Sequence, residues 1–118
     1  MPDRTVLDLS RLEEAFEDDR TGIAELLEMA LETGKKHHRL LEEGLANADT
    51  AVVARAAHGI KGSAGNIGAT VVYQLAIELD ERARAGNLEG ARERIDAIDA
   101  AYARVADQVR EYRRSLSG

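Results

Sequence analysis

The sequence predicts an all-α fold: an antiparallel, up-down bundle of four long helices, with a short additional helix before them. Three observations predict it. Apolar residues recur at steps of three and four along most of the chain, no stretch alternates in the manner of a β-strand, and the only proline is Pro2. Aromatic residues make up 3% of the chain, so aliphatic side chains must fill the core. We expect residues 1–118 to form a single domain.

The first two helices are indicated by a capping motif and by an apolar stripe. Ser10 and Glu13 have the spacing of a capping box, which predicts a short helix that ends near residues 18–19. A long second helix is expected from about Thr21 to Ala46, because its apolar residues fall on one face. These residues are Ile23, Leu26, Leu27, Ala30, Gly34, Leu41 and Leu45.

The other three helices follow in the same way. Residues 47–50 supply capping candidates for a third helix, which continues into a glycine-rich run with a turn or kink at 66–70. A fourth helix is expected over about residues 70–85, with its core face formed by Val72, Leu75, Ala76, Leu79 and Ala83. Residues 86–87 end it and open the last helix, whose apolar stripe comprises Leu88, Ala91, Ile95, Ile98, Tyr102, Val105, Val109, Tyr112 and Leu116.

Composition excludes several classes of function. The chain has no cysteine, which excludes a disulfide scaffold, a zinc–thiolate site and a cysteine nucleophile. Its net charge of −6 argues against a general nucleic-acid binder. No apolar stretch approaches the roughly 20 residues of a membrane span, and the N-terminus lacks the apolar region of a signal peptide. We therefore expect a cytoplasmic protein that binds neither nucleic acid nor membranes.

The glycine-rich run around His58 is the most informative feature of the chain. A glycine inside a helix costs about 1 kcal/mol relative to alanine, so a run of them suggests a use for the space. A helix turns about 100° per residue, which places His58 about 160° from the core residue Ile60. The same geometry gives the third helix a core face of Val53, Ala56, Ile60, Ala64 and Ile67.

His58 is therefore expected on an exposed stripe of small and cationic residues: Ala51, Ala54, Arg55, Lys61, Gly62 and Gly65. A histidine that is neutral near pH 7 keeps one ring nitrogen free for nucleophilic attack. A nearby lysine offsets the negative charge of a transferred phosphoryl group. No acid–base pair stands beside the histidine, so the pattern predicts a site that another protein approaches rather than a self-contained enzyme.

The segment from Ala57 to Ala69, AHGIKGSAGNIGA, resembles the signature of histidine-containing phosphotransfer (HPt) domains of multistep two-component phosphorelays, roughly H-x-x-K-G-[SA]-[SA]-x-x-x-G. The resemblance extends over nearly the whole chain, because the family fold is a four-helix bundle with a short N-terminal helix. It implies that His58 carries the phosphoryl group on the ring nitrogen that faces solvent. It further implies that Lys61 assists with the phosphate charge and that Gly62 opens room for a partner.

The resemblance also implies a partner and supporting residues. The family often has Glu or Gln on the next helix, holding the other ring nitrogen; the matching residue here is Asp80, one methylene shorter than Glu, and Arg84 adds positive charge one turn on. The expected partners are receiver domains of response regulators, belonging to a hybrid sensor kinase and a downstream regulator. The receiver would hold the Mg²⁺, while this chain, a monomer, would bind no cofactor. Docking is expected at Ala54, Arg55, Gly62, Ser63, Gly65, Tyr73 and Ile77.

Other functions stay open on the residues alone. The phosphoacceptor and dimerisation region of a sensor histidine kinase also carries a helical histidine, but usually with an acidic residue directly after it and a proline soon after, where this chain has Gly59 and no proline. A helical interaction module with an incidental histidine is the second alternative. His37 and His38 suggest a metal pair, but adjacent helical residues point about 100° apart and no third ligand is suitably spaced, so we predict no metal site. His37 falls near the core stripe and is expected to be a partly buried packing residue.

Overall fold

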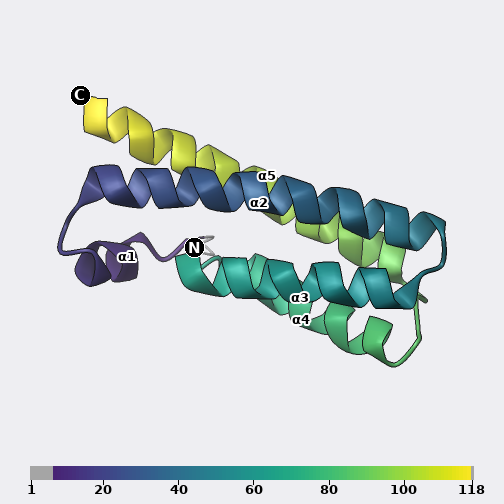
Figure 1. Cartoon of the computed structure of the whole chain (residues 1–118). Helices are drawn as coiled ribbons and strands as arrows, with labels where there is room; N and C mark the ends of the chain where they lie inside the picture. Colours follow the sequence, from purple (N-terminus) through teal and green to yellow (C-terminus); the bar gives the residue numbers. More distant parts are fainter. Residues whose placement is uncertain (1–6, 118) are drawn as a thin grey trace, which may run out of the picture.

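The computed structural model describes residues 7–117, so Pro2 lies outside the described residues. The chain forms five α-helices: α1 (Leu9–Ala15), α2 (Arg20–Ala46), α3 (Thr50–Ile67), α4 (Thr70–Arg84) and α5 (Ala91–Ser117) (Figure 1). The described part of the chain contains no strand. The all-α fold class predicted from the apolar periodicity is therefore confirmed. None of these helices is long and apolar enough to cross a membrane.

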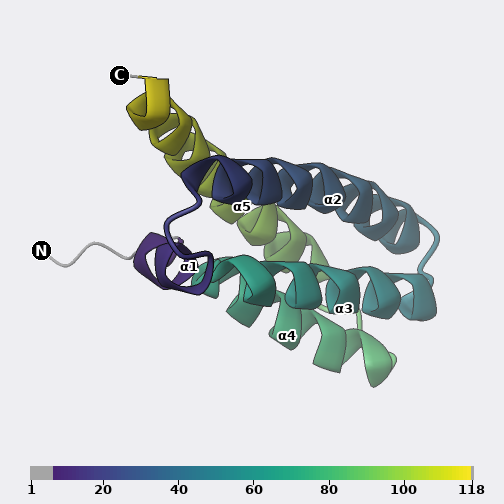
Figure 2. The ribbon, with the colours of Figure 1, turned by 60° about the vertical axis from the view of Figure 1, so that its left-hand side comes forward.

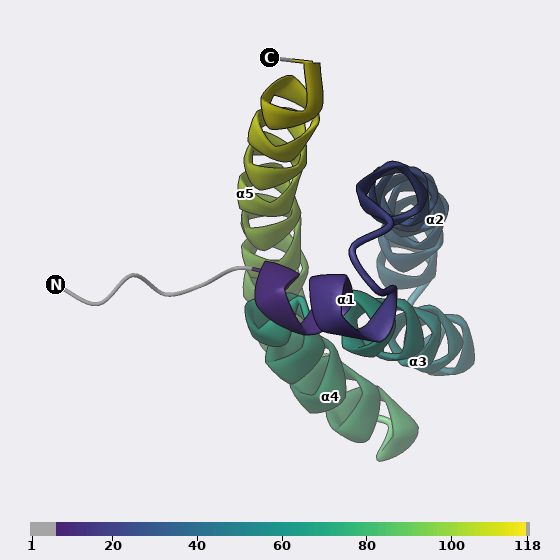
Figure 3. The same cartoon turned by 90° about the vertical axis from the view of Figure 1, so that its left-hand side faces the viewer.

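The four long helices are arranged so that each contacts two others. Helix α2 packs against α3 and α5, and α4 packs against the same two helices. Successive long helices run in opposite directions in Figure 1, and the last turns of α5 project beyond α3 and α4 (Figures 1 and 2). Helix α1 crosses the end of the molecule at which α3 passes into α4 (Figure 3). There, Asp8 lies against the backbone of Gly68.

Aspartate side chains begin the first three helices. Asp8, Asp19 and Asp49 each accept a hydrogen bond from a backbone N–H three residues later, at distances of 3.1–3.2 Å. This is the bonding expected of an N-cap residue, because the first N–H groups of a helix have no partner within the helix. The predicted capping box at Ser10 is therefore wrong: Asp8 caps α1, and Ser10 lies inside the helix.

Two further boundaries differ from the predictions. Helix α1 ends at Ala15, a few residues before the predicted end, because Glu17 and Asp18 have positive φ angles that a helix does not allow. The last helix begins at Ala91 rather than at residues 86–87. Leu88, which was expected inside that helix, precedes it and packs half-buried against the core. The turn predicted at 66–70 is confirmed: α3 ends at Ile67, and Gly68 takes the left-handed conformation with φ 70°.

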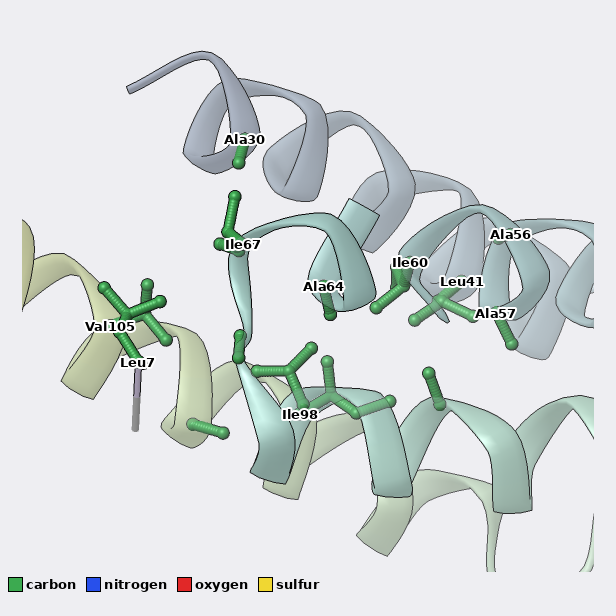
Figure 4. Packing of buried hydrophobic residues seen from close by; sticks show 14 of the residues in the cluster. Leu7, Ala30, Leu41, Ala56, Ala57, Ile60, Ala64, Ile67, Ile98 and Val105 are labelled. Carbon is green, nitrogen blue, oxygen red and sulfur yellow. The ribbon is translucent and has the colours of Figure 1, made fainter. Parts of the chain in front are cut away.

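The core is mainly aliphatic and lies between the four long helices. All five residues predicted for the core face of α3 are buried, among them Ile60 and Ala64. Figure 4 shows Ile60, Ala64 and Ala57 along one side of α3, facing Leu41 of α2 and Ile98 of α5. This packing fixes the rotation of α3 about its axis. The opposite side of α3, which carries His58, is consequently turned toward solvent.

Two glycines of α2 allow neighbouring helices to approach closely. A Cβ atom on Gly34 would lie 2.8 Å from the Cε1 and Cζ atoms of Tyr102 in α5, and one on Gly44 would lie 2.8 Å from Cγ2 of Val53 in α3. Both distances are too short for carbon atoms in contact. Burial against α2 also raises the pKa of Tyr102 to about 12, so its hydroxyl is neutral at physiological pH. The close approach of α2 to α3 and α5 depends on the absence of side chains at Gly34 and Gly44.

We predict that Gly34→Ala lowers the free energy of unfolding by about 1–3 kcal/mol, because the ring of Tyr102 must move to admit the methyl group. Urea unfolding monitored by circular dichroism measures the change. Gly62→Ala is the matched control, since Gly62 is also helical but its Cβ would meet nothing within 4 Å. That variant should gain about 0.5–1 kcal/mol from helix propensity alone. A Gly34→Ala variant as stable as Gly62→Ala would contradict the prediction.

Candidate functional site

His58 projects from the middle of α3 into solvent. Its side chain is 70% exposed, and the buried residues of the same helix occupy the other side. The exposed position predicted from the helical geometry is therefore the observed one. A ring in this position can be reached by another protein without any movement of the core.

A buried carboxylate from the next helix faces this ring. Asp80 of α4 is the single charged residue that is buried among residues 7–117, and its side chain is 3% exposed. Its Oδ2 lies 3.6 Å from Nδ1 of His58. That distance suits an ion pair but is too long for a hydrogen bond. The structure thus places the Asp80 carboxylate beside Nδ1 of His58, at a distance beyond that of a hydrogen bond.

Arg84 binds the other oxygen of the same carboxylate. Its Nε donates a hydrogen bond to Oδ1 of Asp80 at 3.1 Å, while the guanidinium remains largely exposed. The contact follows from sequence spacing, because residues four apart lie one above the other on a helix. Asp80 is therefore shared between two cationic or potentially cationic groups, His58 from α3 and Arg84 from α4.

Two more cations flank the histidine on its own helix. Arg55 and Lys61 stand three residues before and three after His58, which places all three on neighbouring surface positions. Arg55 is exposed and Lys61 is half-buried. Neither takes part in an ion pair within residues 7–117. Both are thus available to an anion that approaches the ring.

The glycines of α3 differ in what surrounds them. A Cβ on Gly62 would meet nothing within 4 Å, so this residue leaves open surface one turn after His58. A Cβ on Gly65 would lie 3.3 Å from Cε1 of Tyr73, which places the tyrosine ring of α4 against that backbone. Both glycines were predicted to leave the surface around His58 bare, but only Gly62 does so.

Gly59 has a packing role that the sequence analysis missed. A Cβ there would overlap Nε2 of His37, so the imidazole of His37 on α2 occupies the space that a side chain would need. His37 is half-buried, as predicted from its place near the core stripe. A signal was available in the sequence, since Gly59 lies to one side of the His58 stripe and His37 near the facing core. To predict that the two residues are in contact, however, one must know the register of α2 against α3.

The residues predicted for docking do not all reach the surface. Arg55 and Gly62 are exposed, whereas Ser63, Gly65, Tyr73 and Ile77 are half-buried. Ala54 was expected on the exposed stripe, but only 9% of it is accessible and it belongs to the core. The error has a physical cause: α3 is covered by both α2 and α4, so its buried arc is wider than a single stripe.

His38, the residue next to His37, has a separate environment. Nε2 of His38 lies 3.3 Å from Glu42 and 3.9 Å from Asp99. Glu42 is also held by Arg92 of α5 through two hydrogen bonds, which lower the pKa of the carboxyl group. No group of three or more His, Cys, Asp or Glu residues suited to a metal ion was found among residues 7–117.

Comparisons with known proteins found a matching family model and a similar solved structure. The family model described as "Hpt domain" matches residues 25–108, more than half of the chain. The crystal structure of histidine-containing phosphotransfer protein B (HptB) from Pseudomonas aeruginosa PAO1 is similar, with a TM-score of 0.84 and 28% sequence identity. That match covers 95% of this chain and 98% of the other. No curated protein sequence matches the chain.

We predict that Gly59→Ala destabilises the protein by about 1–3 kcal/mol, in spite of the better helix propensity of alanine, because the new methyl group overlaps the ring of His37. The free energies of unfolding of Gly59→Ala, His37→Ala and the double variant form a double-mutant cycle. The double variant should be more stable than the two single effects predict, by about 0.5–3 kcal/mol. Additive effects would show that the two residues do not depend on each other.

Proposed function

Since the chain belongs to the Hpt domain family, we propose that it is the phosphoryl carrier of a multistep two-component phosphorelay and that His58 holds the phosphoryl group. The observation that carries the assignment is the pairing of a 70% exposed imidazole with a buried carboxylate at its Nδ1. A carboxylate on that side favours the tautomer with the proton on Nδ1. The lone pair then lies on Nε2, the nitrogen available to an incoming protein.

The transfer step follows from this tautomer. Nε2 of His58 attacks the phosphorus of an aspartyl phosphate on a receiver domain, and the bond between phosphorus and the aspartate oxygen breaks. The receiver carboxylate leaves with the electron pair, while the ring, which keeps its proton on Nδ1, gains positive charge. Asp80 opposes that charge, and its contact with Nδ1 is expected to shorten as the charge develops, since catalytic contacts tighten in the reacting complex. Transfer to a second receiver is the same step in reverse.

The cations near His58 act on the phosphoryl group in this proposal. Lys61 lies within one turn of the ring and has no ion-pair partner among the described residues, so its ammonium group is free to offset the phosphoryl charge. Arg55 on the preceding turn adds to the same field. Arg84 supplies charge less directly, because its Nε is already bonded to Asp80.

The partners we propose are receiver domains, one of a hybrid sensor kinase and one of a downstream regulator. The receiver would bring the Mg²⁺ and most of the catalytic groups, and the carrier would orient the nucleophile. Gly62 offers the bare surface for its approach, flanked by Ser63, Gly65, Tyr73 and Ile77. We further propose that the chain acts as a monomeric, non-enzymatic single domain, an antiparallel up-down bundle of α2–α5 preceded by α1. Family membership favours this function over a sensor-kinase dimerisation region and over a module with an incidental histidine.

We predict that His58→Gln abolishes phosphoryl transfer to this chain. Each receiver domain of the source organism is phosphorylated with a radioactive small-molecule donor and incubated with the carrier, and label on the carrier is followed on gels. The wild-type chain should gain an acid-labile label from at least one receiver, and His38→Gln, the matched control, should gain it equally. Label that persists in His58→Gln would place the phosphoryl group elsewhere.

We predict that Gly62→Leu slows transfer from the same receiver about ten- to a hundredfold, because a side chain there displaces the partner from its in-line position. Initial rates at equal receiver concentration measure the effect. The substitution should leave the protein as stable or stabilise it by up to about 1 kcal/mol, since the site is helical and open. Ala100→Leu, an exposed helical position on α5, is the control and should transfer normally. Equal rates for the two variants would remove Gly62 from the docking surface.

A further inference from the structure

We propose that Arg84 is a positioning residue that lengthens the lifetime of the phosphoryl group on His58, because it shares the carboxylate of Asp80 with the imidazole. The inference rests on the proposed function, since it concerns the histidine that carries the phosphoryl group. It adds a regulatory element to that site: the strength of an ion pair within α4 sets the stability of a group held on α3.

The geometry places one fixed anion between two movable partners. Asp80 is buried, whereas the side chains of Arg84 and His58 are 65% and 70% exposed. Oδ1 of Asp80 accepts a hydrogen bond from Nε of Arg84 at 3.1 Å, and Oδ2 lies 3.6 Å from Nδ1 of His58. A carboxylate removed from water requires compensation by nearby cations or donors. Arg84 already supplies the shorter contact, so less of the negative charge is available to the imidazole.

The chemistry of the phosphorylated ring makes this sharing consequential. With the phosphoryl group on Nε2, a proton can reside only on Nδ1 of His58. The protonated ring is the better leaving group, because it departs as neutral imidazole. A carboxylate close to Nδ1 favours the protonated form, so Asp80 promotes loss of the phosphoryl group. Because Arg84 donates a hydrogen bond to the same carboxylate, it weakens the attraction of Asp80 for the proton on Nδ1 and so slows the loss of the phosphoryl group.

The loss without a partner is an ordinary hydrolysis. The oxygen of a water molecule forms a bond to phosphorus while the bond from phosphorus to Nε2 breaks. The electron pair returns to Nε2 of His58, the ring keeps its proton on Nδ1, and the proton of the water is released with inorganic phosphate. The charged groups that face the ring are Asp80 and, through it, Arg84 from α4, together with Arg55 and Lys61 from α3. Only Arg84 is bonded to the carboxylate at Nδ1.

The test measures the lifetime of the phosphorylated carrier in the absence of any receiver. The wild-type chain and its variants are labelled with radioactive phosphoramidate, freed of reagent and followed at one fixed neutral pH. Arg84→Met should shorten the half-life about two- to fivefold, the size expected for one partly exposed ion pair. Arg84→Lys should restore most of it, and Arg82→Met, which removes a neighbouring charge of α4, should leave it unchanged. Nitrogen NMR should also show a larger protonated fraction of Nδ1 in phosphorylated Arg84→Met.

A double-mutant cycle separates this mechanism from direct contact between Arg84 and the phosphoryl group. Asp80→Asn should lengthen the half-life, and adding Arg84→Met to it should produce no further change. An Arg84 effect that persists without the carboxylate would overturn the inference, as would equal half-lives for Arg84→Met and Arg82→Met. If phosphoramidate labels His58 but these half-lives agree, only the inference fails. If His58 takes no label in the wild-type chain, the proposed function fails and the inference fails with it.

Discussion

The site depends on one electrostatic constraint, the burial of the Asp80 carboxylate between α3 and α4. A charge removed from water is stable only where cations or donors surround it, and the structure offers His58 on one side and Arg84 on the other. The α3–α4 packing must therefore keep the two helices in a single register. A shift of α4 by one residue would move the Asp80 carboxylate away from Nδ1 of His58, so that Arg84, on the same helix, would be its single remaining partner. The requirement for a paired charge thus links the packing of the core to the orientation of an exposed ring.

The glycines of α3 show two separate reasons for accepting a poor helix former. At Gly59 and Gly65 the space that a side chain would take is filled by the rings of His37 and Tyr73, respectively. These two glycines therefore allow α3 to pack closely against α2 and α4. A Cβ on Gly62 would meet no atom within 4 Å. This glycine lowers helix stability by about 1 kcal/mol relative to alanine, and no packing contact requires it. A position that is costly and unoccupied is best explained by access to the neighbouring histidine. The spacing of the glycines alone did not distinguish these cases.

Sequence reasoning reached the features that depend on one helix at a time. Rotation of 100° per residue was enough to place Ile60 in the core and His58 in solvent, and cap chemistry was enough to start α3 near Asp49. It failed where two elements decide the outcome. Ala54 is buried because a second helix covers its side of α3, and Gly59 accommodates His37 only in the observed register of α2. The start of α1 was also misplaced: the capping box was assigned to Ser10, whereas the Asp8 side chain, two residues earlier, accepts the hydrogen bond from the N–H of Arg11.

The same arrangement explains why a carrier would use moderate rather than strong charge around its histidine. A carrier must release the phosphoryl group as readily as it accepts it, and about 1.4 kcal/mol of extra stabilisation shifts such an equilibrium tenfold. Several free cations on the ring would hold the group too tightly, whereas none would leave its charge unopposed. Here Lys61 is unpaired among the described residues, while Arg84 is engaged by Asp80. The buried carboxylate therefore links the two groups: it supports the positive ring during transfer, and its bond to Arg84 limits how much of its negative charge reaches that ring.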